Sequence, residues 1–197
     1  IIPAALMVDG ICRIENIPRI KDVDAIVNIL KFLGAEVCSP APDILEINAS
    51  GVSSFMADCE LARSMRASYY LLGALLGRFG NAHVRMPGGC DFGLRPIDQH
   101  IKGFETLGAA VTIDNDVVIA KSKKLFASSV YLDIVSVGAT INIMLAASRI
   151  AGTTIIENAA KEPHVVDLAN FLNAMGANIK GAGTDTIRII GVDKMRG

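Results

Sequence analysis

The chain has 197 residues, of which 51% are hydrophobic, 5% aromatic and 20% charged, and its formal net charge is −1. This length and aliphatic content predict one compact domain with its own core. The near-neutral charge and the lack of a basic stripe with interleaved aromatic residues exclude nucleic acid or an anionic membrane as the principal partner. The most apolar stretch, Ile134–Ala147, is interrupted by polar residues and is too short to cross a bilayer.

Cysteine and histidine usage narrows the class further. The 4 cysteines have no C-x-x-C spacing and the 3 histidines have no metal-ligand spacing, so we expect neither a metal site nor a disulfide scaffold. With no secretory signal, this pattern predicts a cytoplasmic protein. Cys12, Cys38 and Cys59 lie in contexts that indicate packing roles.

In chain order, the first segment, Ile1–Met7, has helical character and lacks an initiator methionine, so we expect the chain to be a piece of a longer protein. A motif with two apolar residues before Gly-Ala-x-aliphatic then occurs three times, around Gly34, Gly108 and Gly176. Each copy has the apolar spacing of one helical face, and its glycine suits a left-handed helix end. A strand is predicted before each helix and another after it, which indicates three βαβ-type repeats.

The predicted repeats cover roughly residues 8–55, 81–125 and 126–192 of a single domain, 1–197. The strands before the three helices are predicted at Ile11–Ile14, His83–Met86 and Thr153–Glu157, and the closing strands at Ile44–Ile47, Val117–Ala120 and Ile187–Ile190. Two further helices are predicted between repeats, at about 60–79 and 137–151, the second with Ser136 as its N-cap. Because three amphipathic helices need a shared buried centre, the fold class is α/β with pseudo-threefold symmetry, helices inside and sheets outside.

The most informative loop is Pro87-Gly-Gly-Cys90, which places one thiol between Arg85 and Arg95. Glycines on one side and polar residues on the other predict an exposed loop, and nearby cations favour the thiolate. From the local sequence alone, a reactive thiol and a small buried hydrophobe are equally consistent with Cys90.

Several ordered motifs together carry a family resemblance. They are Met65-Arg-Ala-Ser68, Arg78-Phe-Gly80, Pro87-Gly-Gly-Cys90, Arg95-Pro-Ile-Asp-Gln-His100, Val135-Ser-Val-Gly-Ala-Thr140 and Thr154–Pro163. From end to end, the chain resembles the UDP-N-acetylglucosamine enolpyruvyl transferases. The resemblance implies an inside-out α/β barrel of three repeats, one of two such domains with the active site between them. The family's second domain and N-terminal segment are absent from this sequence.

The reaction implied by the resemblance is transfer of enolpyruvyl from phosphoenolpyruvate to the 3-hydroxyl of UDP-N-acetylglucosamine, with release of phosphate. It is the first committed step of bacterial peptidoglycan synthesis, and no metal or organic cofactor is implied. Addition followed by elimination needs an acid, a base and cations for the phosphate. Because the family's Lys-Asn pair, aspartate base and second-domain arginine have no counterparts here, we expect the isolated domain to be inactive.

The resemblance also implies the site residues. Cys90 matches a loop cysteine that acts as an acid toward phosphoenolpyruvate, forms an adduct with it and is alkylated by fosfomycin. The implied substrate-binding residues are Arg66, Arg95, Pro96, Ile97, Asp98, Gln99, Ser136, Val137 and Gly138. In this assignment Arg95 faces phosphate, Asp98 reads the uracil edge, and the helix after Ser136 points its N-terminus at the diphosphate.

His100 and Glu162 match two further polar positions near the family's cleft. The alternatives are a histidine hydrogen-bonded within the fold and a glutamate that caps a helix beginning at Pro163. Surface exposure without function is the alternative for Arg66 and Arg95. The chain departs from the family pattern at Ile134 and Val135, where a lysine occurs, and Tyr70 stands where some relatives have tryptophan.

Two other functions remain open at this level. One is the sister enolpyruvyl transferase of aromatic amino-acid synthesis, which shares the fold but lacks the Pro-Gly-Gly-Cys loop. The other is a non-catalytic module that binds a UDP-sugar or a protein partner. An apolar surface left by the missing domain would favour self-association.

Overall fold

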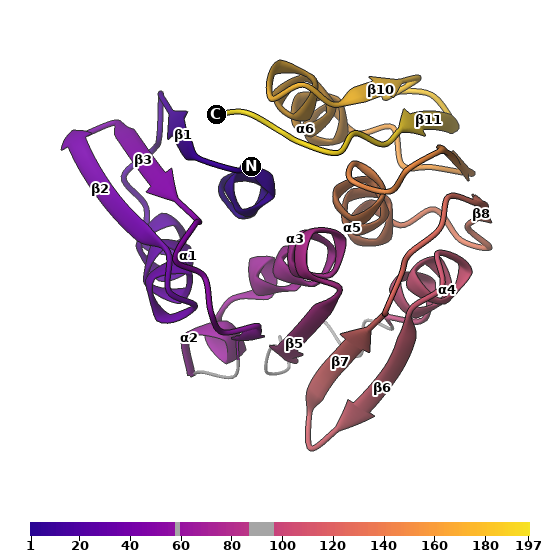
Figure 1. Ribbon diagram of the computed structural model, residues 1–197, viewed down its shortest axis with the longest axis horizontal. Helices are drawn as coiled ribbons and strands as arrows, with labels where there is room; N and C mark the ends of the chain where they lie inside the picture. Colours follow the sequence, from indigo (N-terminus) through magenta and orange to yellow (C-terminus); the bar gives the residue numbers. More distant parts are fainter. Residues whose placement is uncertain (58–59, 87–96) are drawn as a thin grey trace.

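The computed structural model describes residues 1–57, 60–86 and 97–197, and one strand arrangement occurs three times in it (Figure 1). Each unit has a strand, a helix and two further strands. The first unit consists of β1 (Ile11–Ile14), α1 (Lys21–Phe32), β2 (Glu36–Ala41) and β3 (Ile44–Asn48). The second consists of β5 (Asn81–Arg85), α4 (Asp98–Thr106), β6 (Ala110–Asp114) and β7 (Val117–Lys121). The third consists of β9 (Thr153–Glu157), α6 (Pro163–Ala174), β10 (Asn178–Lys180) and β11 (Thr186–Ile190).

In each sheet the last strand of the unit lies in the middle and pairs antiparallel with the two others. The orders are β1-β3-β2, β5-β7-β6 and β9-β11-β10. Short strands β4 (Met56–Ala57) and β8 (Ser129–Tyr131) add parallel edges to the second and third sheets. Gly34, Gly108 and Gly176 have φ angles of 103°, 90° and 102°, the left-handed conformation expected at the helix ends. The predicted fold class is confirmed.

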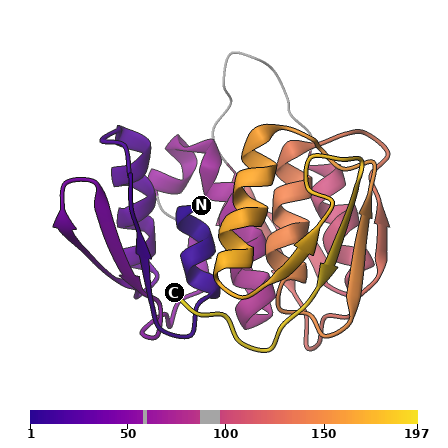
Figure 2. The same cartoon turned by 90° about the horizontal axis from the view of Figure 1, so that it is seen from above.

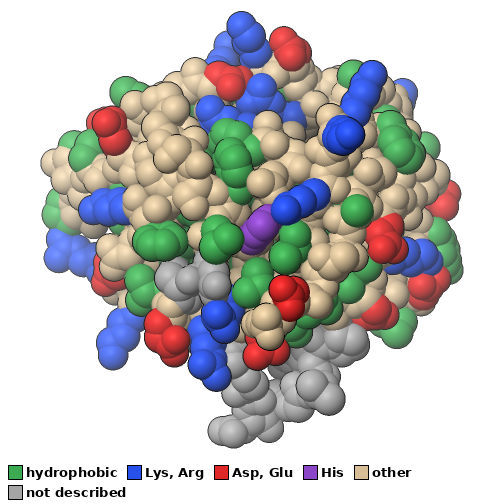
Figure 3. Space-filling model, turned by 60° about the horizontal axis from the view of Figure 1, so that its bottom comes forward, with side chains coloured by type: hydrophobic (Ala, Val, Ile, Leu, Met, Phe, Trp, Pro, Cys, Tyr) green, Lys and Arg blue, Asp and Glu red, His purple; other side chains and the backbone are tan. Residues whose placement is uncertain are grey.

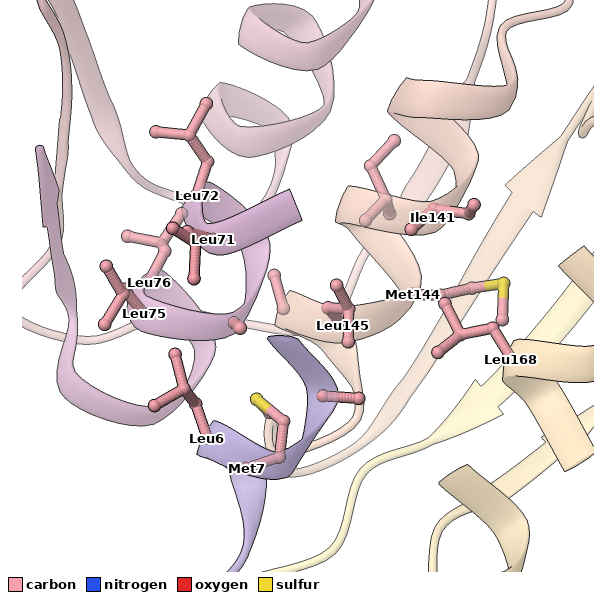
Figure 4. Close-up of a cluster of buried hydrophobic side chains, with 14 of the residues drawn as sticks. Leu6, Met7, Leu71, Leu72, Leu75, Leu76, Ile141, Met144, Leu145 and Leu168 are labelled. Atoms are coloured by element: carbon pink, nitrogen blue, oxygen red, sulfur yellow. The ribbon is translucent and has the colours of Figure 1, made fainter. Parts of the chain in front are cut away.

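The sheets lie on the outside and the helices in the centre (Figures 1 and 2). Three elements occupy the middle, namely η1 (Ile2–Met7), α3 (Tyr70–Phe79) and α5 (Val137–Ala147). Their side chains form one apolar cluster, in which Leu6 and Met7 lie close to the leucines of α3 and to Leu145 of α5 (Figure 4). The predicted helix at the start of the chain is therefore confirmed as a short 3-10 helix, and every one of its residues is buried.

The two central helices approach each other through glycine. A Cβ at Gly73 would lie 2.9 Å from the Cα of Asn142, and one at Gly77 would lie 2.8 Å from the Cα of Ala146. The Asn142 Oδ1 accepts a hydrogen bond of 2.8 Å from the Gly73 N–H, and the Asn142 Nδ2 donates to the Gly138 carbonyl over 3.0 Å. A buried asparagine thus has its amide satisfied by both helices.

Residues 60–79 are not the single helix that the apolar pattern predicted. They form α2 (Glu60–Ser64), η2 (Arg66–Tyr69) and α3, with an extended backbone at Met65 (φ −129°, ψ 117°). The Ser68 hydroxyl donates to the Ala62 carbonyl over 2.9 Å, so a side chain accompanies the break by bonding a helix carbonyl. The predicted helix at 137–151 also ends earlier, at Ala147.

Two arginines hold the end of η1 to the central helices. Arg78 of α3 donates to the Leu6 carbonyl over 2.6 Å, and Arg149, just after α5, donates to the Met7 carbonyl over 3.0 Å. Arg149 also forms a 3.0 Å ion pair with Asp9. Charged donors therefore satisfy carbonyls that a short helix leaves without intrahelical partners.

We predict that Gly73→Ala lowers the free energy of unfolding by about 2 kcal/mol, because the new methyl group would collide with the backbone of α5. Alanine's greater helix propensity, about 1 kcal/mol, opposes this effect without cancelling it. Urea denaturation measures the change. Gly10→Ala is the control, since a Cβ there meets nothing within 4 Å. A Gly73→Ala protein as stable as the wild type would contradict the close contact.

Candidate functional site

A pocket of about 380 Å³ lies where η2 meets the first turns of α4 and α5. Its lining comes from three separate parts of the chain: Arg66, Ala67, Tyr69, Tyr70, His100, Ser136, Val137 and Gly138. Five of these residues were predicted as site residues from the sequence. The break at Met65 brings Arg66 to the pocket, because a continuous helix through this residue would turn its side chain differently.

The N-terminus of α5 forms one wall of the pocket. Ser136 is its N-cap, with the side chain accepting a 3.3 Å hydrogen bond from the Ala139 N–H. The Thr140 hydroxyl donates to the Ser136 carbonyl over 2.8 Å and accepts from the Ala160 N–H over 3.1 Å, which fixes this turn to the loop before α6. The N–H groups of Val137 and Gly138 have no carbonyl one turn earlier to bond, so they are available donors at the positive end of the helix dipole.

His100 packs directly against this helix end. It is only 7% exposed, and a Cβ on Gly138 would lie 2.7 Å from its Nε2, so the close approach requires glycine at position 138. The ring lies 6.1 Å from the ring of Tyr69. Its Nδ1 is buried and has no hydrogen-bond partner among the described residues. An unpaired buried nitrogen beside free backbone donors indicates a place where a ligand could supply the missing partner.

Burial lowers the pKa of His100 to about 4, the positive charge of Arg66 lowers it further, and Asp98 opposes both effects. The imidazole is therefore neutral at pH 7, so one ring nitrogen donates and the other accepts. Arg66 is exposed at the pocket and supplies a full positive charge. Burial raises the pKa of Tyr69 and Tyr70, against the effect of Arg66, so both phenols keep their protons. The pocket thus combines one cation, neutral donors and a helix N-terminus, a set suited to an anion.

The other predicted binding residues lie at the start of α4. Ile97 is buried, Asp98 is exposed, and the side chain of Gln99 is buried against the chain that leads into α5. None of these three lines the pocket, although His100 in the same turn does. Cys90, Arg95 and Pro96 lie outside the described residues, as does Cys59.

Glu162 occupies the N-cap position of α6 but its side chain makes no capping hydrogen bond, so the capping alternative is wrong. Its Oε2 is buried without a partner among the described residues. Of the other cysteines, Cys12 is buried, and burial raises the pKa of its thiol to about 11. Cys38 is exposed, so the packing role expected for it is wrong.

Sequence reasoning missed Tyr69 and the contact between His100 and Gly138. Tyr69 carries no local signal, because its role depends on the break at Met65. Within the described ranges, no group of three or more histidine, cysteine, aspartate or glutamate side chains could hold a metal ion. No helix in those ranges is long and apolar enough to span a membrane. On the face shown in Figure 3, cationic and anionic side chains are interspersed.

Comparison with known proteins gives one family. The family model described as EPSP synthase (3-phosphoshikimate 1-carboxyvinyltransferase) matches residues 1–197. The chain is 57% identical to UDP-N-acetylglucosamine 1-carboxyvinyltransferase of Clostridium botulinum, covering 100% of this chain and 48% of that protein. It is 58% identical to UDP-N-acetylglucosamine 1-carboxyvinyltransferase 3 of Caldanaerobacter subterraneus, covering 100% of this chain and 47% of the relative. The chain therefore spans about half the length of the relatives it matches, and the resemblance expected from its motifs is confirmed.

Solved structures share the fold. The enolpyruvyl transferase NikO from Streptomyces tendae superposes with a TM-score of 0.82 at 24% identity, over 98% of this chain and 46% of that one. EPSP synthase from Acinetobacter baumannii gives a TM-score of 0.75 at 18% identity, over 99% of this chain and 45% of that one. At these identities the likeness shows the fold alone.

We predict that His100 stays neutral in the folded protein until the pH falls to about 4, which a side-chain NMR titration would measure. In the unfolded chain its pKa is about 6.5, so between these values the unfolded state binds more protons. The free energy of unfolding should therefore fall as the pH is lowered from about 6.5 toward 4. His100→Gln should flatten this slope, whereas His164→Gln, at an exposed position, should not. Titration of His100 near pH 6.5 in the folded state would contradict the prediction.

Proposed function

The chain belongs to the EPSP synthase (3-phosphoshikimate 1-carboxyvinyltransferase) family, and on this premise we propose that it is the UDP-sugar-binding part of an enolpyruvyl transferase. The proposed reaction transfers enolpyruvyl from phosphoenolpyruvate to the 3-hydroxyl of UDP-N-acetylglucosamine and releases phosphate. Such an enzyme acts in the cytoplasm, in peptidoglycan synthesis for cell-wall growth and division. The printed names of relatives 57% and 58% identical to the chain support this substrate.

The observation that carries the proposal is the meeting of the α5 N-terminus with Arg66 across one pocket. A diphosphate needs several donors at once, and backbone N–H groups with a helix dipole supply them without a lysine. This matters because Ile134 and Val135 stand where a lysine occurs in the family pattern. Arg66 adds a charge-assisted hydrogen bond, and the neutral His100 has a nitrogen free to bond the ligand.

The remaining assignments extend the site along the chain. We assign residues 95–99 to the uridine and its phosphates, with Arg95 facing phosphate and Asp98 reading the uracil edge. The first turn of α4 carries Asp98, Gln99 and the pocket residue His100, which supports their participation. Glu162, with its unpaired buried oxygen, is assigned to the substrate side of the α6 N-terminus.

We assign the acid role to Cys90. Its S–H proton goes to the methylene carbon of phosphoenolpyruvate while the sugar 3-oxygen bonds to the adjacent carbon and a base takes the hydroxyl proton. Elimination then breaks the bond to phosphate, and loss of a methyl proton restores the double bond. The base and the cations for the departing phosphate are expected on the part of the family's fold that this sequence does not contain, so the isolated chain should bind substrate without turnover.

The sister reaction on 3-phosphoshikimate is the alternative that the family description itself raises. The solved EPSP synthase is only 18% identical to the chain, whereas relatives named for the UDP-sugar are 57% and 58% identical. The identity therefore favours the UDP-sugar.

We predict that the chain binds UDP-N-acetylglucosamine and that Arg66→Ala raises the Kd about tenfold or more, because a charged donor to phosphate is lost. Isothermal titration calorimetry measures the Kd. Arg63→Ala is the matched control, since Arg63 is exposed on α2 and does not line the pocket. Binding of shikimate 3-phosphate in place of the UDP-sugar would contradict the proposal, and unchanged affinity in Arg66→Ala would contradict the role of the pocket.

We predict that fosfomycin alkylates Cys90 in an intact polypeptide that contains the family's second domain, more rapidly with UDP-N-acetylglucosamine present. Intact-mass analysis should show one adduct, which Cys90→Ser abolishes. Cys38→Ser is the matched control, because it removes an exposed thiol and should leave labelling unchanged. Unaltered labelling in Cys90→Ser would contradict the assignment of the reactive thiol.

A further inference from the structure

We propose that Gln99 is a positioning residue, which fastens the chain before α5 to the first turn of α4 and so holds the α5 N-terminus in place for the ligand. The inference rests on the proposed function, because it assigns that helix end to the diphosphate. It concerns a side chain that does not itself line the pocket.

Every polar atom of the Gln99 amide has a partner within the protein. Its Oε1 accepts a hydrogen bond of 2.9 Å from the Asp133 N–H, and its Nε2 donates to the Asp133 Oδ2 over 3.4 Å. The same Nε2 donates to the Asp98 Oδ2 over 3.0 Å. With a side chain only 7% exposed and its donors and acceptor engaged, Gln99 acts on Asp133 and Asp98 rather than on a ligand.

A second residue of α4 reinforces the same junction. Lys102 donates to the Asp133 Oδ1 over 2.6 Å, and its ammonium lies 5.7 Å from the centre of the Tyr131 ring. The bond from Lys102, followed by that from Gln99, holds the pKa of Asp133 below its ordinary value, so this carboxyl is ionised at neutral pH. Asp133 is thus bonded through its backbone and both of its carboxylate oxygens.

The chain between Asp133 and the helix has little else to hold it. Ile134 is 67% exposed and Val135 is 50% exposed, so neither anchors the segment in the core. Ser136 follows as the N-cap of α5. The bonds at Asp133 are therefore the last side-chain attachment before the turn whose N–H groups face the pocket.

The first turn of α4 consequently contacts the α5 N-terminus at two points. Gln99 bonds to Asp133 before the helix, and His100 packs against Gly138 in its first turn. Residues about 35 positions apart in sequence are thereby coupled, and the segment assigned to the uridine cannot shift without moving the donors assigned to the diphosphate.

The test uses the intact polypeptide, with steady-state kinetics for both substrates. In Gln99→Leu the buried Asp133 N–H loses its partner, and we expect the KM for UDP-N-acetylglucosamine to rise about tenfold. The KM for phosphoenolpyruvate and kcat should change less than about twofold, because the interaction lost is one of ground-state positioning. Asn173→Leu is the matched control, since the Asn173 amide similarly bonds the N–H and carbonyl of Ile179 far from the pocket. It should lower the Tm without changing either KM.

An exchange of groups separates positioning from direct contact and does not depend on Gln99→Leu folding well. Gln99→Glu alone places a third carboxylate beside Asp98 and Asp133, and the KM for the UDP-sugar should rise at least tenfold. Combining it with Asp133→Asn restores one amide and one carboxylate, and the KM should return to within about threefold of the wild-type value. Failure of the double variant to recover would overturn the inference.

The two levels of the proposal fail differently. A wild-type polypeptide that neither binds nor turns over UDP-N-acetylglucosamine would contradict the proposed function, and this inference with it. A wild-type enzyme that uses the UDP-sugar, together with an unchanged KM in Gln99→Leu, would contradict the positioning role alone.

Discussion

The close contact between α3 and α5 is the constraint on which the rest of the structure depends. Two helix backbones approach closely only where side chains are absent, and here Gly73 and Gly77 face Asn142 and Ala146. Asn142 then bonds both the Gly73 N–H and the Gly138 carbonyl, so the separation of the helices is set by hydrogen bonds as well as by packing. Because η2 leads directly into α3, and Gly138 lies in the first turn of α5, this one contact sets where Arg66 stands relative to the α5 N-terminus.

The surrounding units complete the site from two directions. The second unit supplies α4, whose first turn touches the α5 N-terminus through His100. The loop before α6 supplies the Ala160 N–H that bonds Thr140. Burial keeps His100 uncharged, so the positive potential in the pocket comes from Arg66 and from oriented backbone dipoles. Dipoles fixed by folding need little reorganisation when an anion binds, which suits them to hold a diphosphate that is not itself the reacting group.

Much of this could be predicted from the sequence, for identifiable reasons. The repeated glycine after an apolar helical face predicted the three helix ends, since few residues other than glycine adopt a positive φ there. Ser136 predicted the start of α5 because its hydroxyl has one evident use as a cap. The break at Met65 could not be predicted, since it depends on tertiary packing and on a bond between Ser68 and Ala62 that no local pattern encodes. The Gln99 contact with Asp133 also joins distant segments, and local spacing carries no signal for it.

The central claim is that the α5 N-terminus holds the diphosphate of a UDP-sugar. A crystal structure of the intact polypeptide with UDP-N-acetylglucosamine tests it most directly. The account predicts diphosphate oxygens within hydrogen-bonding distance of the Val137 and Gly138 N–H groups, with the Arg66 guanidinium on the opposite side of the pocket. A UDP-sugar bound elsewhere, with these N–H groups bonded only to water, would contradict it.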